Sequence, residues 1–351
     1  MKLKPLYLDS AATTPVDSRV KEAMLPYFDE IFGNASSKHV YGKEANQAIE
    51  IARGHVANII NAEPQEIYFT SGATEAINWA MKGYLSANPD KGNHVITVKT
   101  EHQAVLNTCE YLETIGYEVT YLNVDENGMI SLEDLKSAIR KNTAMISVMY
   151  VNNEIGIIQD IKSIGKIARE NDICFFCDAS QAVGKVSVDI VEDDIDMLCM
   201  SAHKTQGPKG VGALHVKKGI KLTPLMHGGG QEGNMRGGTY NTPLVVGLGE
   251  ACKIAQTEFD QRIAQLNLER EKWENYFTEN DFGVVNFSMV NRAPHILSIT
   301  LNNMDADEFL MMKSKEFSAS TGSACNSNVV EDSHVLREIF KESNSIVRVS
   351  I

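Results

Sequence analysis

The sequence predicts an α/β fold, in which a large domain built on a mostly parallel sheet is followed by a smaller α+β C-terminal domain. Over roughly the first 220 residues, short apolar runs alternate with amphipathic helical stretches. The runs are apolar almost throughout, as is typical of strands covered by helices on both faces. Further along, one long helical stretch precedes fewer strand signals, and 351 residues suffice for two domains.

The expected elements follow one another along the chain. The expected strands of the large domain are 66–70 (EIYFT), 94–98 (HVITV), 118–122 (EVTYL), 144–151 (AMISVMYV), 172–178 (DICFFCD) and 195–201 (IDMLCMS), with helices that include 74–87 and 161–170. The later part predicts one helix over 244–278, a strand at 295–301, a helix over 305–316 and a final strand at 345–351. We place an N-terminal arm at 1–14, the large domain at 15–250 and the small domain at 251–351.

Composition excludes several classes of protein. The chain carries 33 Lys and Arg against 46 Asp and Glu, a net charge of -13, which disfavours direct binding to nucleic acid or anionic membranes. The N-terminus has no apolar signal region, and no apolar run approaches the roughly 18 residues of a membrane helix. The six cysteines have no framework spacing, so we expect reduced thiols in a cytoplasmic protein.

Chemically useful residues follow the predicted strands, where ligands bind in open α/β sheets. After 66–70, the small residues of Ser71–Glu75 open a helix, which either binds a phosphate group or is simply capped. After 94–98 comes His102, and after 144–151 come Asn152 and Asn153, which either contact a ligand or build a turn.

Two further strand ends carry an acid and an amine. Asp178 ends an apolar strand, where a buried carboxylate needs a partner such as the protonated ring nitrogen of a cofactor. Lys204, in Ser-Ala-His-Lys before a Gly/Pro turn, suits an imine with a carbonyl compound. Together with the phosphate-binding turn, these groups predict a pyridoxal phosphate site. No metal site is expected, because Cys174 and Cys177 would point to opposite faces of their strand.

At these residues the sequence resembles the cysteine desulfurases of the class V aminotransferase group, which are pyridoxal phosphate enzymes of fold type I. The matching motifs occur in family order over nearly the whole chain: YLDSAATTP (7–15), GNASSKHVYG (33–42), SGATE (71–75), EHQAV (101–105), VNNEIGIIQDI (151–161), DASQAVGK (178–185), SAHKTQGPKGVGAL (201–214), HGGGQEGNMRGGTYN (227–241) and TGSACNS (321–327).

The resemblance implies a role for each matching residue. Lys204 would bind the cofactor aldehyde and move the substrate Cα proton, Asp178 would pair with the ring nitrogen, and His102 would stack on the ring and assist proton transfer. A homodimer is implied, because the family threonine that matches Thr239 of this sequence reaches the phosphate of the neighbouring subunit. The remaining implied cofactor contacts are Ala73, Thr74, Asn153, Gln181, Ser201, His203 and Thr239.

Cys325 lies in the run Ser-Thr-Gly-Ser-Ala-Cys-Asn-Ser-Asn, a loop composition that leaves a thiol accessible. The resemblance implies that it attacks the sulfur of L-cysteine, becomes a persulfide, and passes the sulfur to acceptor proteins. The other five cysteines lie in helix or strand patterns that predict core positions. A selenocysteine lyase, another class V enzyme and a catalytically silent scaffold are the alternatives. Neither of the two enzymes needs a protein-borne sulfur carrier, and the intact set of lysine, aspartate and cysteine argues against the scaffold.

The sequence departs from the family at the residue expected to bind the substrate carboxylate. In the family the strand matching 345–351 usually continues into a Gly-Arg whose arginine binds the carboxylate, whereas this sequence stops at Ile351. Three explanations are open. The sequence is truncated, the carboxylate is bound in a different way, or Arg348 binds it with the help of Asn34. Residues 294–337 resemble the desulfurases of DNA phosphorothioation, while iron–sulfur assembly and tRNA thiolation are the other candidate pathways.

Overall fold

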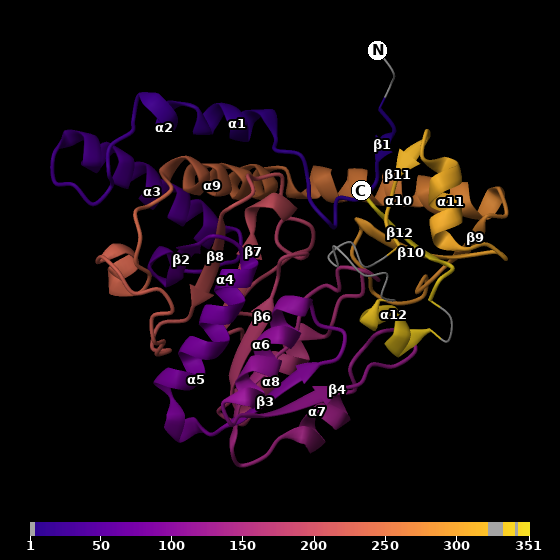
Figure 1. The fold of residues 1–351 in the computed structure, drawn as a ribbon, viewed down its shortest axis with the longest axis horizontal. Helices are drawn as coiled ribbons and strands as arrows, with labels where there is room; N and C mark the ends of the chain where they lie inside the picture. The colour runs from indigo at the N-terminus through magenta and orange to yellow at the C-terminus, as the bar shows by residue number, and fades with distance from the viewer. Residues whose placement is uncertain (1–3, 322–332, 341–342) are drawn as a thin grey trace.

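The computed structural model describes residues 4–321, 333–340 and 343–351. Its large sheet has seven strands in the order β2-β8-β7-β6-β5-β3-β4 (Figure 1). Every pair is parallel except those of β8, which runs against both neighbours. The predicted α/β fold is therefore confirmed. The strands are β2 (Ile67–Thr70), β3 (His94–Val98), β4 (Glu118–Leu122), β5 (Thr143–Ser147), β6 (Cys174–Asp178), β7 (Met197–Ser201) and β8 (Gly212–Val216).

Helices cover both faces of this sheet. One apolar cluster joins the sheet to α3 (Val40–Asn58), α7 (Leu132–Ala138), α8 (Ile161–Glu170) and α9 (Thr242–Thr257). A second cluster on the opposite face involves α4 (Ala73–Asn78), α5 (Tyr84–Ala87) and α6 (Gln103–Thr114). Cys177 belongs to the first cluster and Cys174 to the second, as the alternation of side chains along β6 requires.

The predicted helix at 74–87 is continuous but not uniform. A π-helical turn, Trp79–Gly83, joins α4 to α5. The indole Nε1 of Trp79 donates to the carbonyl of Thr223, whose own N–H donates to the carbonyl of Gly83. A Cβ at Gly83 would lie 2.7 Å from the Thr223 carbonyl oxygen, so this close approach of two backbones requires glycine.

The predicted single helix over 244–278 is wrong, because it is interrupted between α9 and α10 (Phe259–Glu279) at Glu258, whose φ of -101° and ψ of 13° are not helical. The two helices bury different surfaces. Gly249 of α9 lies so close to α3 that a Cβ there would be 2.5 Å from the Cα of Ala52. In contrast, α10 buries Trp273 and Phe277 against the small sheet.

The C-terminal part contains an antiparallel sheet of order β12-β10-β9, formed by β9 (Gly283–Val285), β10 (Ile296–Leu301) and β12 (Ile346–Ser350). It packs with α11 (Ala306–Lys313), while α12 (His334–Ile339) packs against Ile155 and Ile157, which follow β5, and against Ile346 of β12. The N-terminal strand β1 (Leu6–Tyr7) pairs with β11 (Phe317–Ser318), and Leu8 joins this smaller core. The remaining helices are α1 (Ser18–Met24) and α2 (Pro26–Asp29).

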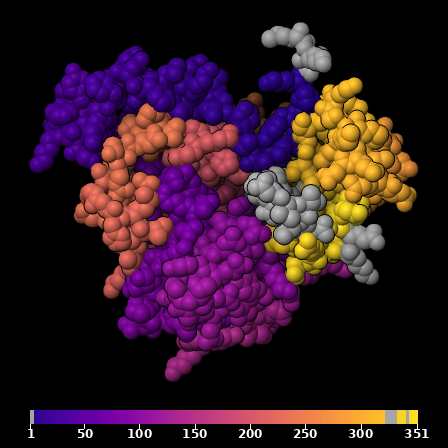
Figure 2. Space-filling view, in the orientation of Figure 1, coloured from indigo at the N-terminus to yellow at the C-terminus, as the bar shows by residue number. Residues whose placement is uncertain are grey.

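The two parts lie side by side. In Figure 2 the orange-to-yellow C-terminal part lies beside the purple and magenta residues of the large sheet, with indigo N-terminal residues at their junction. The domain boundaries 1–14, 15–250 and 251–351 stay a prediction. None of the helices in the described part of the chain is long and apolar enough to cross a membrane.

Candidate active site

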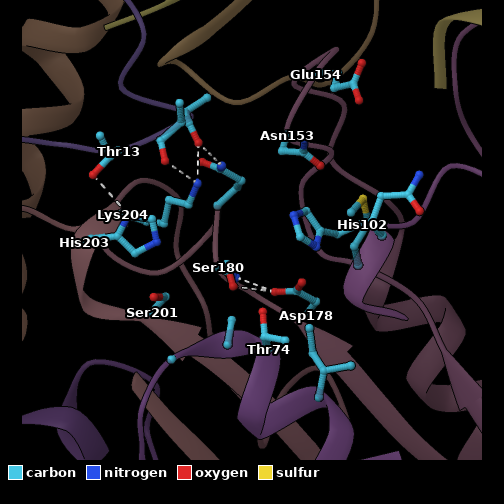
Figure 3. A pocket seen from close by; sticks show the side chains of 18 of the residues that line it. Thr13, Thr74, His102, Asn153, Glu154, Asp178, Ser180, Ser201, His203 and Lys204 are labelled. Atoms are coloured by element: carbon cyan, nitrogen blue, oxygen red, sulfur yellow. Dashed lines mark hydrogen bonds between the residues drawn. The ribbon is translucent and has the colours of Figure 1, made fainter. Parts of the chain in front are cut away.

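A cavity of about 630 Å³ lies where the carboxyl ends of the parallel strands meet the N-terminal segment and the C-terminal part (Figure 3). Parallel strands bring their carboxyl ends to one edge of a sheet, so the residues that follow β2, β3, β5, β6 and β7 converge here. The sequence-predicted residues that line the cavity are Ala73, Thr74, His102, Asn153, Asp178, Gln181, Ser201, His203, Lys204 and Arg348.

The N-terminus of α4 forms one wall of the cavity. Gly72 has φ +153° and leads directly into the helix, whose first N–H groups have no acceptor within the helix. Glu75 fixes this turn, because its carboxylate accepts from the backbone N–H of Ser71 at 2.7 Å and from Arg236 at 2.8 and 3.1 Å. The result is a rigid anion-binding turn presented by Ala73 and Thr74.

Asp178 stands at the end of β6 and is 6% exposed. Its Oδ1 accepts from the N–H of Ser180 at 2.9 Å and from the hydroxyl of Ser180 at 2.6 Å (Figure 3). The thiol of Cys199 lies 3.4 Å from the same oxygen. Because these donors hold one carboxylate oxygen, the orientation of the carboxylate within the cavity is fixed.

Lys204 follows β7 in a short 3-10 turn, Ala202–Lys204. Its amine donates to the carbonyls of Ala11 at 2.6 Å and Ala12 at 2.8 Å, which holds Nζ at the cavity wall. The neighbouring His203 has its Nδ1 3.1 Å from the hydroxyl of Thr13. Burial, with the charges of Lys204 and Lys209, lowers the pKa of His203 to about 4, so this imidazole is neutral near pH 7.

His102 caps α6, and its Nδ1 accepts from the N–H of Ala104 at 3.1 Å. The proton of a neutral ring is therefore on Nε2. The two asparagines after β5 have different environments. Asn152 is buried and builds a turn, since its Oδ1 accepts from the N–H groups of Glu154 and Ile155. Asn153 lines the cavity (Figure 3).

Gln181 and Ser201 complete the wall near β6 and β7, and both are buried. Gln181 donates through Nε2 to the carbonyl of Ala11 at 2.9 Å, so it shares an acceptor with Lys204. Ser201 lies close to the α4 turn, because a Cβ built at Gly72 would be 3.8 Å from the Ser201 hydroxyl.

Arginines line the side of the cavity nearest the C-terminal part. Arg348 of β12 is 3% exposed, pairs with Asp9 at 2.6 Å and donates to the carbonyl of Asn153 at 3.0 Å. Arg337 of α12 also lines the cavity. Sequence reasoning pointed to Arg348 but not to Arg337, to which no motif assigned a role.

Two of the described predicted site residues do not line the cavity. Asn34 and Thr239 are exposed and do not line it. Cys325 lies outside the described residues. The other five cysteines are buried, as predicted, and burial raises the pKa of their thiols, that of Cys252 to about 12. None of these five is therefore suited to act as a thiolate nucleophile.

Sequence reasoning missed two contributions to the site. The carbonyls of Ala11 and Ala12 hold Lys204, although their motif YLDSAATTP predicted no role for them. On the other side, His334 of α12 lies 2.8 Å from the carbonyl of Glu101 and 3.2 Å from Gln103. The hydroxyl of Ser333 also donates to Glu154 at 2.5 Å. Backbone acceptors and contacts between distant segments leave no local sequence pattern.

The residues present fit pyridoxal phosphate. The α4 turn suits a phosphate, the buried Asp178 carboxylate suits a protonated ring nitrogen, and the amine of Lys204 suits an aldehyde. A buried carboxylate and an amine that line one cavity are the pair of groups that this cofactor needs. Fold and site together define a pyridoxal phosphate enzyme of fold type I.

Comparisons with known proteins agree. The chain matches the family model described as Aminotransferase class-V over residues 6–351. Cysteine desulfurase IscS of Neisseria meningitidis serogroup C (strain 053442) is 52% identical over 342 residues, or 95% of this chain and 83% of the relative. A solved NifS-like protein is 33% identical with a TM-score of 0.92, covering 99% of this chain and 93% of that one. A structure titled SspA in complex with cysteine is 38% identical with a TM-score of 0.86, covering 99% and 98%.

The chain therefore belongs to the class V aminotransferase family. Within that family it is a pyridoxal phosphate-dependent cysteine desulfurase similar to IscS, and the resemblance inferred from the sequence motifs is confirmed.

Proposed function

We propose that this enzyme converts L-cysteine to L-alanine and transfers the sulfur to Cys325 as a persulfide, with Lys204, Asp178 and His102 acting around the cofactor. The observation that supports this most directly is that Lys204 and Asp178 line one cavity beside an anion-binding turn. The same cavity is large enough for a cofactor and an amino acid.

Bound pyridoxal phosphate supplies an electron-accepting ring, which makes the Cα proton of an attached amino acid acidic. Lys204 removes that proton, and the Ala11 and Ala12 carbonyls orient its amine toward the cavity. Asp178, oriented by Ser180, keeps a proton on the ring nitrogen. The backbone N–H groups of Ala73 and Thr74 hold the phosphate.

Cys325 and His102 carry out the transfer of sulfur from the substrate. The Cys325 thiolate attacks the substrate Sγ, so that an S–S bond forms while the Cβ–Sγ bond breaks and leaves its electron pair on carbon. A proton must then reach that carbon. His102 is placed to supply it from Nε2, because its Nδ1 already accepts from Ala104. L-alanine leaves, and the enzyme retains the persulfide.

Arg348 is the proposed anchor for the substrate carboxylate, whereas Asn34, the further contact expected from the sequence, is exposed and does not line the cavity of this chain. Arg348 lines the cavity, but Asp9 already accepts from one of its nitrogens, which partly neutralises its charge. Arg337 supplies a second guanidinium at the same cavity. Replacing Arg348 by Gln should raise the KM for L-cysteine about 10-fold or more, as expected for loss of a charged hydrogen bond. If only Arg337→Gln raises KM, the anchor is Arg337.

We also propose a homodimer in which Thr239, exposed in this chain, reaches the phosphate site of the partner. Sedimentation should give twice the chain mass, and Thr239→Val should weaken cofactor retention. The proposed sulfur recipients are acceptor proteins of iron–sulfur assembly, tRNA thiolation or DNA phosphorothioation in the cytoplasm. Co-purification followed by transfer of labelled sulfur from Cys325 identifies which of them is used.

The decisive experiment compares product yields. The purified enzyme with L-cysteine and a thiol should release alanine and sulfide in equal amounts. A selenocysteine lyase would act on L-selenocysteine while leaving L-cysteine nearly untouched. A silent scaffold would be colourless and would release neither product.

A further inference from the structure

A buried hydrogen-bonded group lies directly behind Lys204. Gln181, Lys185 and His295 are 4%, 6% and 0% exposed. The Oε1 of Gln181 accepts from Nζ of Lys185 at 3.2 Å and lies 3.3 Å from Nε2 of His295. The Nε2 of Gln181 donates to the carbonyl of Ala11, which also accepts from Lys204. One carboxamide therefore connects the buried pair to the cavity.

These neighbours allow only one orientation of the Gln181 carboxamide. The carbonyl of Ala11 can only accept a hydrogen bond, so the NH2 group must face it. Lys185 donates through Nζ to the amide oxygen of Gln181, so that oxygen faces Lys185. A flipped amide would place oxygen against oxygen at Ala11 and NH2 against the Lys185 amine. The second N–H of Gln181 is consequently left on the side of the cavity that it lines.

The charges around Lys185 and His295 are all positive. Lys185 is faced by Lys204 and Arg262, and His295 is faced by Lys185, Lys204 and Arg348. Burial and these neighbours lower the pKa of Lys185 and that of His295 well below their usual values. Among the described residues no carboxylate forms an ion pair with Lys185, and its hydrogen-bond acceptor is the amide oxygen of Gln181.

We propose that Lys185 and His295 are positioning residues that hold the Gln181 carboxamide with its NH2 group toward the cavity. A hydrogen-bond donor then faces the phenolic oxygen of the cofactor, in place of an acceptor that would repel it. This inference rests on the proposed role of Gln181 in binding pyridoxal phosphate. The residues act through Gln181 and touch neither substrate nor cofactor.

The test is the pH dependence of the visible absorbance of the purified holoenzyme. A donor stabilises the anionic phenolic oxygen, so its loss should move the midpoint of the absorbance change to higher pH. Gln181→Leu removes the donor and should raise the midpoint by about 1 to 2 pH units, the equivalent of one hydrogen bond to a charged group. Lys185→Met releases the amide and should shift the midpoint in the same direction by up to this amount.

The double variant Gln181→Leu/Lys185→Met tests whether Lys185 acts through Gln181. If it does, Lys185→Met should not shift the absorbance midpoint further once Gln181 has been replaced. Tyr150→Phe is the matched control, since it removes buried hydrogen bonds to Ser187 and Asp193 without contacting Gln181, and it should leave the midpoint unchanged. If Lys185→Met does not fold, His295→Leu makes the same test and should also raise the midpoint.

Two results would overturn the inference in distinguishable ways. If Gln181→Leu raises the midpoint while Lys185→Met and His295→Leu leave it unchanged, the positioning role is wrong and the cofactor contact stands. The positioning role is equally wrong if the Lys185 effect persists in full without Gln181, because Lys185 would then act directly through charge. If Gln181→Leu itself has no effect, the proposed contact with the cofactor fails and the positioning role fails with it.

Discussion

Replacing Asp178 by Asn changes the charge of the proposed ring-nitrogen partner while keeping its shape. Ser180 donates twice to Oδ1 of Asp178, and an asparagine oxygen can accept the same two hydrogen bonds. The amide NH2 then takes the place of Oδ2, so a donor replaces an acceptor and the negative charge is lost. The perturbation is therefore electrostatic, with little expected change in packing at a residue that is 6% exposed.

The expected loss is that of one preorganised electrostatic contact in a buried site. Such a loss lowers kcat by about 10² to 10³-fold, or about 2.7 to 4 kcal/mol of activation free energy. The assay measures alanine formation at saturating L-cysteine, with circular dichroism as the control for folding. Ser180→Ala is the matched control, because it removes one hydrogen bond and keeps the charge, and it should lower kcat far less. A fall of less than threefold for Asp178→Asn would refute the assigned role.

Three further outcomes are expected. Lys204→Ala should lose the visible absorbance of the bound cofactor and all turnover, as measured by a spectrum after dialysis, and a retained visible band would count against the role of Lys204. Arg53→Met should lower the free energy of unfolding, measured by urea denaturation, by about 3 to 5 kcal/mol, because it leaves the Glu232 carboxylate buried without its cation. Adding Glu232→Gln to this variant should recover much of the lost free energy. His203 has a pKa of about 4 in the fold against 6.5 normally, so the unfolded chain binds more protons than the folded chain between these pH values. The free energy of unfolding should therefore fall as the pH drops from 6.5 to 4. His203→Gln should reduce this pH dependence, and an unchanged dependence would contradict the assignment.

Strand ends were the most predictable part of the site. Asp178 ends a strand in both the sequence pattern and the structure, and it lines the cavity that Lys204 and the α4 turn also line. Local composition was enough to predict these site residues, because the last residues of parallel strands lie at one edge of the sheet. The same logic predicted that Cys174 and Cys177 separate to opposite faces.

What the sequence did not predict depends on contacts between distant segments. The break at Glu258 separates α9, which packs on α3, from α10, which packs on the small sheet. The carbonyls of Ala11 and Ala12 act through the backbone, which side-chain patterns do not reveal. Arg337 reaches the cavity because α12 packs against Ile155 and Ile157, which follow β5.

Sulfur passes from the substrate to Cys325 in the proposed reaction, and every later transfer depends on that step. A single turnover with sulfur-labelled L-cysteine, followed by peptide mass analysis without reductant, tests it directly. One added sulfur atom on the peptide that contains Cys325, with one alanine released per active site, is the predicted result. Label absent from that peptide while alanine forms at the normal rate, or a Cys325→Ser variant that still releases sulfur as fast as the parent, would contradict it.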